Sequence, residues 1–313
     1  MMKHYFSLNE YYKQKFGKKV YRLAISGGMI CPNRDGTLDT RGCIFCSAGG
    51  SGEFAACAAL PITEQLEQAK KRVQAKTSDQ LYIAYFQPFT NTYADVDTLR
   101  QLYEEAIAPD DIVGLAIGTR PDCLPAEVIA LLSEMNEKKP VTVELGLQTI
   151  HESTARYIRR GYPLTVYEEA VKVLHGAGIE VITHVILGLP GESEEMMYES
   201  VSYVGRLTDG VKLQLLHVIE GTDLAREYRM GKFKTLTMEE YARILCRCVE
   251  LLPENVVIAR LTGDGDKRSL IAPLWSADKK RVLNFINRTL DENNIKQGRL
   301  AHHSKKYSET ELL

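Results

Sequence analysis

A regular alternation of short apolar runs and longer amphipathic segments constrains the fold of this chain more than any other feature. Apolar runs rich in β-branched residues predict strands, and segments with an apolar period of about 3.6 residues predict helices. Because helices join the strands, we expect parallel pairing through right-handed crossovers. Thr63 and Ser193 are expected to cap two of the helices. The expected strands are 20–26, 80–86, 112–118, 141–147, 179–187 and 211–218, and the helices between them are 63–76, 96–107, 125–137, 153–177 (broken at Gly161 and Pro163) and 193–208.

Six strand–helix units are too few to close an eight-stranded barrel. We therefore expect an α/β fold of the partial (β/α)6 TIM-barrel type, with catalytic groups at the carboxyl ends of the strands. The barrel and a basic N-terminal extension are expected to occupy residues 1–220. Residues 221–313 are expected to form a C-terminal extension packed on the barrel, with helices at 238–251 and 277–290, a strand at 256–261 and a basic tail.

The composition is that of a globular protein. Apolar residues make up 44% and charged residues 26% of the 313 residues, which argues against disorder. No run approaches the ~20 apolar residues of a membrane span, and the N-terminus lacks the apolar core of a signal peptide. Seven cysteines, an odd number, do not indicate a disulfide framework. We therefore expect a cytoplasmic protein without a membrane partner, whose reduced thiols can bind a metal or a cluster.

Three of the cysteines follow the first predicted strand. Eleven residues separate Cys31 from Cys43, and two separate Cys43 from Cys46. Three thiolates can hold a four-iron four-sulfur (4Fe-4S) cluster and leave one iron open to activate a small molecule. The alternative is a zinc site, which would need a fourth ligand, and Cys57 is the nearest candidate. The spacing therefore predicts a metal centre of one of these two kinds.

These features together resemble the radical S-adenosylmethionine (SAM) superfamily. The three-cysteine loop after the first strand, the six strand–helix units and the strings IGTRPD, ELGLQTI and ILGLPGE carry the resemblance. The first cysteine gap is wider than usual in the superfamily and is similar to that of the Elongator-catalytic-subunit-like branch. Longer strings cover almost the whole chain and resemble the bacterial YtqA/YhcC-type subgroup, among them YFSLNEYYKQKFGKKVYR, CPNRDGT, YFQPFTNTYA, RPDCLP, ELGLQTIHEST, LLHVIEGT and RLTGDGD followed by APLW.

The resemblance implies a chemistry. In this superfamily SAM binds the open iron through its amino and carboxylate groups, and reductive cleavage gives a 5′-deoxyadenosyl radical that abstracts hydrogen from the substrate. An electron donor such as flavodoxin or ferredoxin is implied as a partner. Relatives in the branch modify the wobble uridine of tRNA, and the subgroup is associated with converting 5-carboxymethylaminomethyl-(2-thio)uridine to 5-aminomethyl-(2-thio)uridine. The segment after the predicted barrel is too short for an Elongator-type acetyltransferase domain, which favours trimming of an existing substituent.

Two basic ends of the chain fit an RNA substrate. Residues 1–22 carry six Lys or Arg against one acid, interleaved with Tyr and Phe, and residues 267–306 carry ten against three. Basic side chains neutralise phosphates, and aromatic rings stack on unpaired bases. The alternative is two solvated helical faces. A radical SAM enzyme with another substrate, and a noncatalytic zinc- or cluster-containing RNA-binding protein, also stay open.

The resemblance assigns SAM contacts near the end of the fourth strand. Gln148 and Arg160 match the pair that the family places near the SAM ribose and carboxylate. Arg156 and Arg159 compete with Arg160 for that role, and a surface salt bridge is the alternative for Arg160. Glu144 shares a strand face with Gln148, so both are expected to point into the lumen.

Weaker SAM contacts are expected after the second and fifth strands. Where the family has a Gly-Gly-Glu-like string, this chain has residues 87–92, so backbone carbonyls, Gln87 or Asn91 are expected to hold the SAM amino group. Ile186 and Gly188 are expected near the adenine, because glycine permits close approach of the backbone.

The sequence assigns no catalytic residue. Glu144, His184 and His217 are candidates because they lie on or near predicted lumen strands, and a packed scaffold role is the alternative for each histidine. Arg260 and Asp264 are expected either to close the barrel or to contact the substrate.

The remaining cysteines carry weaker signals. Cys123 lies just past the third predicted strand and is a further catalytic candidate, with a structural thiol as the alternative. Cys246 and Cys248 have one residue between them in a predicted helix, so they face different sides. We expect these two, and Cys57 outside the zinc alternative, to be half-buried thiols.

Overall fold

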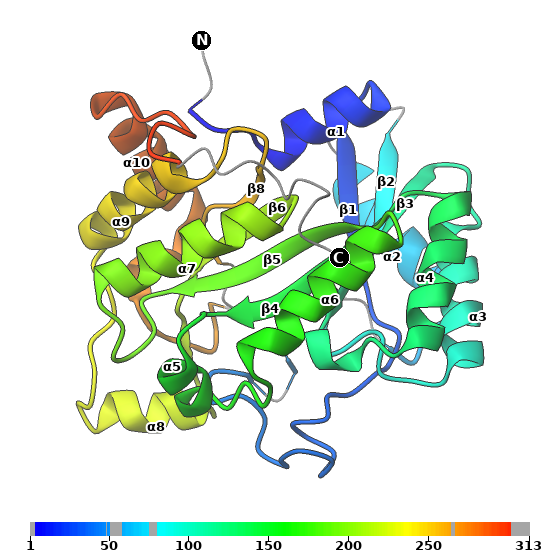
Figure 1. Cartoon of the computed structure of the whole chain (residues 1–313), viewed down its shortest axis with the longest axis horizontal. Helices are drawn as coiled ribbons and strands as arrows, with labels where there is room; N and C mark the ends of the chain where they lie inside the picture. Colours follow the sequence, from blue (N-terminus) through cyan, green and yellow to red (C-terminus); the bar gives the residue numbers. More distant parts are fainter. Residues whose placement is uncertain (1–3, 48, 51–57, 75–79, 264–266, 302–313) are drawn as a thin grey trace, which may run out of the picture.

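A curled sheet of seven parallel strands forms the centre of the computed structural model (Figure 1). The strands neighbour one another in chain order, which confirms the predicted α/β partial barrel. The structure describes residues 4–47, 49–50, 58–74, 80–263 and 267–301. The strands are β1 (Val20–Ile25), β2 (Leu81–Phe86), β3 (Ile112–Thr119), β4 (Val141–Gln148), β5 (Glu180–Leu187), β6 (Gly210–Leu215) and β8 (Val257–Arg260).

The sheet has one strand more than the six-unit prediction. All six expected strands are present with small shifts at their ends, and the additional strand is β8. It comes from the segment expected to pack on the barrel, and it pairs in parallel with β6, with Gly210 opposite Val257. The sheet therefore draws its last strand from beyond residue 220.

Helices cover the convex face of the sheet (Figure 1). Along β4, Val143, Leu145 and Leu147 are buried in the core on the helix side, whereas Glu144 and Gln148 face the lumen, as the alternation of a strand requires. Within the described part of the chain, no helix is both long enough and apolar enough to cross a membrane. The larger helices are α2 (Ile62–Gln74), α3 (Val96–Ile107), α4 (Ala126–Lys138), α6 (Leu164–Gly176), α7 (Glu194–Leu207), α9 (Met238–Leu251) and α10 (Lys279–Glu292). The smaller elements are α8 (Asp223–Arg229), the 3-10 helices η1 (Pro121–Cys123) and η2 (Leu274–Ala277), and an antiparallel pair of β7 (Val218–Ile219) and β9 (Leu270–Ala272).

The helix ends follow local side-chain chemistry. Ser193 caps α7 by accepting a hydrogen bond from a first-turn amide, as predicted. The predicted Thr63 cap is wrong, because Thr63 lies inside the first turn of α2. The predicted break in helix 153–177 is confirmed: α5 (Glu152–Tyr157) and α6 are separated by a segment that contains Gly161, with a positive φ of 86°, and Pro163, which precedes the first residue of α6.

Helix α1 (Leu8–Phe16) closes the end of the half-barrel at which the strands begin (Figure 1), which agrees with the helical alternative for the basic N-terminus but not with a fully solvated face. Tyr12 is buried in one apolar cluster with Ile83 of β2, and the Tyr11 hydroxyl donates a hydrogen bond to Glu180. Both rings belong to the packed floor of the lumen. They are therefore not available to stack on RNA bases, which removes part of the sequence argument for RNA at this end.

Candidate active site

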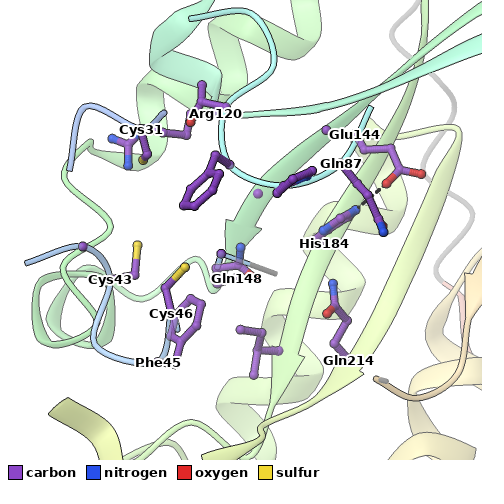
Figure 2. Close-up of a pocket in the computed structure, with 18 of the residues that line it drawn as sticks. Cys31, Cys43, Phe45, Cys46, Gln87, Arg120, Glu144, Gln148, His184 and Gln214 are labelled. Atoms are coloured by element: carbon purple, nitrogen blue, oxygen red, sulfur yellow. Dashed lines mark hydrogen bonds and ion pairs between the residues drawn. The ribbon is translucent and has the colours of Figure 1, made fainter. Parts of the chain in front are cut away.

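A cavity of about 260 Å³ lies at the end of the half-barrel where the strands end. The loop that follows β1 supplies one wall, which includes Cys31, Cys43 and Cys46 (Figure 2). Lumen-facing side chains of β4, β5 and β6 supply the opposite wall. The strand carboxyl ends therefore carry the site, as expected for this type of barrel.

Two side chains fold the cysteine loop, residues 31–46, around the cavity. The Arg34 guanidinium donates to the carbonyl oxygen of Cys46 over 2.9 Å. The Asn33 amide donates to the carbonyl oxygen of Arg159 over 2.8 Å and lies 3.4 Å from Sγ of Cys43. These contacts fix the loop backbone and place an N–H donor beside one sulfur atom.

The three thiols of the cysteine loop face one space, and the sulfur atoms of Cys43 and Cys46 point into it (Figure 2). Burial raises the pKa of Cys43 to about 12 and also raises the pKa of Cys46, so a metal cation is needed to hold them as thiolates. Among the described residues, no three His, Cys, Asp or Glu side chains converge as ligands of one metal ion. Three thiols that line one cavity are the ligand set that a 4Fe-4S cluster with one open iron requires.

The zinc alternative depended on Cys57, which lies outside the described residues. The other cysteines within the described ranges do not line the cavity. Cys246 and Cys248 are buried in α9, more deeply than the half-buried thiols expected.

A buried charge cluster forms the other end of the cavity. The Glu144 carboxylate, whose side chain is 0% exposed, forms ion pairs with Arg22 and Lys212. It also accepts a hydrogen bond from the Tyr85 hydroxyl (2.6 Å), and Nε2 of His184 lies 2.9 Å from it (Figure 2). These four partners come from four different strands, so the carboxylate joins β1, β2, β5 and β6 to β4 across the lumen.

Burial and neighbouring charge set the protonation of this cluster. Burial opposes ionisation of Glu144, but Arg22 and Lys212 outweigh it and hold its pKa well below the usual range. The pKa of Lys212 falls to about 7, mainly through burial, with Glu144 supporting its charge and Arg22 and Arg260 opposing it. The pKa of His184 falls to about 4 through burial and the charge of Lys212. At neutral pH the cluster thus holds a carboxylate, a neutral imidazole and a lysine that titrates.

The side chain of Gln148 lies between the two ends of the cavity (Figure 2). Gln148 is the last residue of β4, and its φ of 71° is one that residues other than glycine seldom adopt. Its Oε1 is buried, and no described residue donates a hydrogen bond to it. A strained backbone together with an unpaired buried amide oxygen marks a position shaped for a ligand.

Comparison with known proteins agrees with this geometry. A family model described as the radical SAM superfamily matches residues 31–204, which is more than half of the chain. The chain belongs to the radical SAM superfamily. A second model, the radical SAM C-terminal domain, matches residues 208–292.

Relatives of this radical SAM protein lie in the predicted branch. It is 44% identical over 298 residues to the uncharacterized protein YtqA of Bacillus subtilis, covering 95% of this chain and 92% of that protein. It is 34% identical over 291 residues to YhcC of Escherichia coli, covering 92% and 93%. It is also 31% identical over 157 residues to a tRNA uridine(34) acetyltransferase of Methanocaldococcus infernus, covering 49% of this chain and 29% of that protein. The chain is therefore a member of the YtqA/YhcC subgroup in the Elongator-like branch.

A solved structure shares the fold. The archaeal Elp3 of Methanocaldococcus infernus superposes with a TM-score of 0.68 at 19% sequence identity. The match covers 89% of this chain and 64% of that chain, so this radical SAM protein spans less than two thirds of the Elp3 structure. At this identity the likeness supports the fold alone.

The alternative for Arg160, a surface salt bridge, is correct in the salt bridge and wrong in the surface: the arginine pairs with Glu152 and is buried. Its guanidinium donates to the carbonyl oxygen of Thr149 (2.6 Å) and to the carboxylate of Glu152 (2.9 Å). Arg160 thus holds the turn after β4, and its contact with the SAM carboxylate stays a prediction. Of the two competitors, Arg159 forms an ion pair with α8 and Arg156 is exposed.

The weaker SAM candidates divide into two groups. Gln87 and Ile186 line the cavity, whereas Asn91 and Gly188 do not. The Asn91 amide donates to the carbonyl oxygen of Gly118 over 2.9 Å, so it fixes the turn after β2. All four SAM contacts stay predictions, and the geometry favours Gln87 and Ile186.

The catalytic candidates also divide. Glu144, His184 and His217 line the cavity, and Cys123 does not. Burial raises the pKa of Cys123 to about 12, which fits the structural alternative, because the reactive form of a cysteine is the thiolate.

Sequence reasoning missed Arg22, Lys212 and Gln214 as site residues. Lys212 and Gln214 alternate along β6, and Arg22 stands in the middle of β1. Long polar side chains inside otherwise apolar strands are the signal that marks them, because an unpaired charge is costly to bury. Arg260 lines the cavity, which is consistent with its expected contact with the substrate. Asp264 lies outside the described residues.

Proposed function

We propose that this protein is a radical SAM enzyme that modifies the wobble uridine of tRNA. The proposal is carried by one cavity that joins three thiols fit for a 4Fe-4S cluster to a buried polar lumen. The relationship to a tRNA uridine(34) acetyltransferase over 49% of this chain supports tRNA as the substrate. The reaction we propose converts 5-carboxymethylaminomethyl-(2-thio)uridine to 5-aminomethyl-(2-thio)uridine, with SAM as the oxidant. Loss of one hydrogen atom and one electron from the methylene beside the carboxylate would give an imine, and water would hydrolyse its C–N bond to release the amine and glyoxylate. Membership of the YtqA/YhcC subgroup supports this choice.

In this proposal the thiols of the cysteine loop hold the cluster, and SAM lies beside Gln148. Cluster and SAM together supply a 5′-deoxyadenosyl radical that abstracts hydrogen from the substrate. Oε1 of Gln148, which receives no hydrogen bond from the described residues, would accept one from SAM. The floor made by α1 and the buried charge cluster excludes water, which a reactive radical requires. An electron donor such as flavodoxin or ferredoxin and a cytoplasmic location complete the proposal.

The RNA surface that we propose differs from the one the sequence predicts. The basic N-terminal segment lies with α1 at the beginning of the strands, away from the cavity mouth (Figure 1). Arg156 is exposed, and so is Arg41, whose guanidinium also pairs with Asp39. Gly42, next to Arg41, and Ile158, two residues after Arg156, line the cavity. These two arginines are therefore the side chains that we assign to tRNA phosphates.

The experiment that tests the proposal is a comparison of tRNA wobble nucleosides from a gene-deletion strain and its parent. We expect the deletion strain to accumulate 5-carboxymethylaminomethyl-(2-thio)uridine at the expense of the aminomethyl form. A plasmid copy carrying Cys246→Ala should restore the parental profile, and one carrying Cys43→Ala should not. An unchanged profile in the deletion strain would contradict the tRNA substrate and leave SAM cleavage as a separate question.

A further inference from the structure

One amine lies in the wall of the cavity. Among the described lining residues Lys212 is the one lysine, and it stands on β6 with its side chain 3% exposed. An amine held out of water loses its proton more readily than one at the surface and can then act as a nucleophile. Binding of the cluster and of SAM does not use this amine, so its chemistry is open to the substrate.

Two oxygen atoms fix the position of Nζ of Lys212. It is ion-paired with the Glu144 carboxylate and donates to the Tyr85 hydroxyl oxygen over 3.0 Å. That hydroxyl donates its own proton to Glu144 over 2.6 Å, so its oxygen is an acceptor toward Lys212. An ammonium group has three N–H donors, and loss of the third proton leaves a lone pair in a direction that neither oxygen occupies. The neutral amine thus keeps both hydrogen bonds and has a lone pair free for a molecule in the cavity.

The residues around Glu144 tolerate a neutral Lys212. Arg22 pairs with one oxygen of the Glu144 carboxylate and Lys212 with the other, so the carboxylate keeps a counter-charge when Lys212 loses its proton. Burial lowers the pKa of Lys212 to about 7 although Glu144 favours the charged form, and the charge of Arg22 adds to the fall. Charged and neutral forms of the amine are therefore both populated at neutral pH.

The proposed reaction needs a nucleophile in a place from which water is excluded. Cleavage of the C–N bond requires addition to the carbon of the substrate imine, and in solution water would add. The radical step, however, requires a site without water, and Tyr12 of α1 packs against β2 to close the floor of the lumen. A fixed amine in the wall resolves this conflict, because it can add to the imine before water enters.

We propose that Lys212 is a covalent catalytic residue whose amine adds to an imine or carbonyl carbon of the substrate. In the proposed function Nζ adds to the imine carbon, one proton passes from Nζ to the substrate nitrogen, and the C–N bond breaks with its electron pair on that nitrogen. 5-Aminomethyl-uridine is released, and the glyoxylate carbon stays on Lys212 as an imine. Water then hydrolyses this second imine, which frees glyoxylate and the amine, so the overall balance stays that of hydrolysis. The C–N step rests on the proposed function, whereas the reactivity of the amine does not.

The first test uses glyoxylate as a probe of the amine. The cluster- and SAM-loaded protein, kept anaerobic and without an electron donor for the cluster, is treated at neutral pH with glyoxylate and cyanoborohydride, which turn an imine into a stable carboxymethyl-lysine. Peptide mass spectrometry then gives the labelling rate of each lysine. We expect Lys212 to be labelled at least about tenfold faster than Lys138, an exposed lysine whose pKa is raised by Glu104. Labelling of Lys212 that is no faster than that of Lys138 would overturn the proposal.

Variants assign the reactive amine. Lys212→Met should lose the fast label, as measured on the intact protein. Lys138→Met is the matched control and should keep it, because it removes an amine from the exposed side of α4. A folded Lys212→Met protein that keeps the fast label would overturn the proposal. If Lys212→Met does not fold, the peptide map of the wild-type protein decides, and a fast label on another lysine instead of Lys212 overturns the proposal.

A borohydride quench separates this inference from the proposed function. The substrate is an anticodon stem-loop with 5-carboxymethylaminomethyl-uridine at the wobble position, sampled through a single turnover of the reduced protein, and borohydride converts an imine on Lys212 to carboxymethyl-lysine. Carboxymethylated Lys212 together with 5-aminomethyl-uridine supports both proposals. 5-Aminomethyl-uridine without carboxymethylated Lys212 at any time supports the proposed function and overturns the role of Lys212. Fast labelling of Lys212 by glyoxylate with an unchanged stem-loop supports the reactive amine and contradicts the proposed function.

Discussion

The two ends of the cavity are built in different ways. The cysteine end comes from one continuous loop, 31–46, whose side chains mostly bond to backbone carbonyls. The charged end comes from single residues of separate strands, joined by ion pairs around Glu144. A loop held by hydrogen bonds to its backbone carbonyls can lose a cysteine ligand without loss of the fold, whereas a buried charge that loses its partner destabilises the fold strongly. Substitutions at the cysteine end should therefore alter SAM cleavage, whereas substitutions at the charged end should alter the stability of the fold and the steps that follow hydrogen abstraction.

The largest effect is expected at the cysteine end. Cys43→Ala should abolish 5′-deoxyadenosine formation, because two thiolates cannot hold the cluster, and iron content should fall from about four atoms per chain. Cys246→Ala, in the buried core of α9, is the matched control and should retain both. Quantifying iron and 5′-deoxyadenosine after anaerobic reconstitution checks this. The reverse pattern between the two variants would refute the ligand assignment.

Loss of the central carboxylate should give the largest change in stability. Glu144→Gln leaves Arg22 and Lys212 buried without their counter-charge, so the free energy of unfolding should fall by about 3–5 kcal/mol. Adding Lys212→Met to Glu144→Gln should recover part of that loss, because it removes one unpaired charge. Denaturant unfolding of the iron-free proteins measures both changes. A fall in the free energy of unfolding of less than about 1 kcal/mol, the level of a surface ion pair, would show that the charged residues around Glu144 do not stabilise the fold as described.

Labelling by glyoxylate should depend on pH through the amine of Lys212. The neutral amine is the reactive form, and a pKa of about 7 means that it prevails above that pH. The raised pKa of Lys138 keeps that lysine mostly charged up to pH 9, so its neutral fraction grows about tenfold per pH unit throughout. The labelling rate of Lys212 divided by that of Lys138 should therefore be constant below about pH 7 and fall about tenfold per pH unit above it. The charged and titratable groups that face Lys212 are Arg22 of β1, Tyr85 of β2, Glu144 of β4, His184 of β5 and Arg260 of β8.

These neighbours do not titrate in the same window. The pKa of Tyr85 lies well above its usual value and that of Glu144 well below. His184 titrates near pH 4, and arginine stays charged throughout. Glyoxylate labelling of one sample series from about pH 6 to 9 tests the prediction. A rate ratio that is flat over this range or that grows with pH would contradict the role of Lys212.

The smallest effect is expected from Asn33. Asn33→Ala removes the amide donor 3.4 Å from the Cys43 sulfur. Hydrogen bonds to cluster sulfurs stabilise the reduced state, so the reduction potential should become more negative by about 20–60 mV, equivalent to one ordinary hydrogen bond. Iron content should stay unchanged. Spectroscopic redox titration measures the shift, with Asn293→Ala at the end of α10 as the control. A positive shift would contradict this contact.

The same contrast explains what the sequence could predict. The cysteine spacing is local, so Cys31, Cys43 and Cys46 are identified without knowledge of the fold, and the alternation of strands and helices predicts the half-barrel. The cluster around Glu144 is not local, because Arg22 and Lys212 meet only when β1 and β6 curl toward β4. The packing of helix α1 was missed for a related reason: the sequence offered it only as a solvated helical face, and its burial depends on the lumen that it closes.

The central claim is that one end of the cavity activates SAM and the other end breaks the C–N bond of the modified wobble uridine through Lys212. Its most direct test is an anaerobic, reduced assay on tRNA that carries 5-carboxymethylaminomethyl-uridine, quenched with borohydride and followed by mass spectrometry of 5′-deoxyadenosine, the nucleosides and the protein. Wild-type protein should form 5′-deoxyadenosine, 5-aminomethyl-uridine and carboxymethylated Lys212, Cys43→Ala none of the three, and Lys212→Met 5′-deoxyadenosine without a carboxymethylated lysine. Iron-loaded wild-type protein that cleaves SAM but leaves the nucleoside unchanged, or that converts it without carboxymethylated Lys212, would contradict the account.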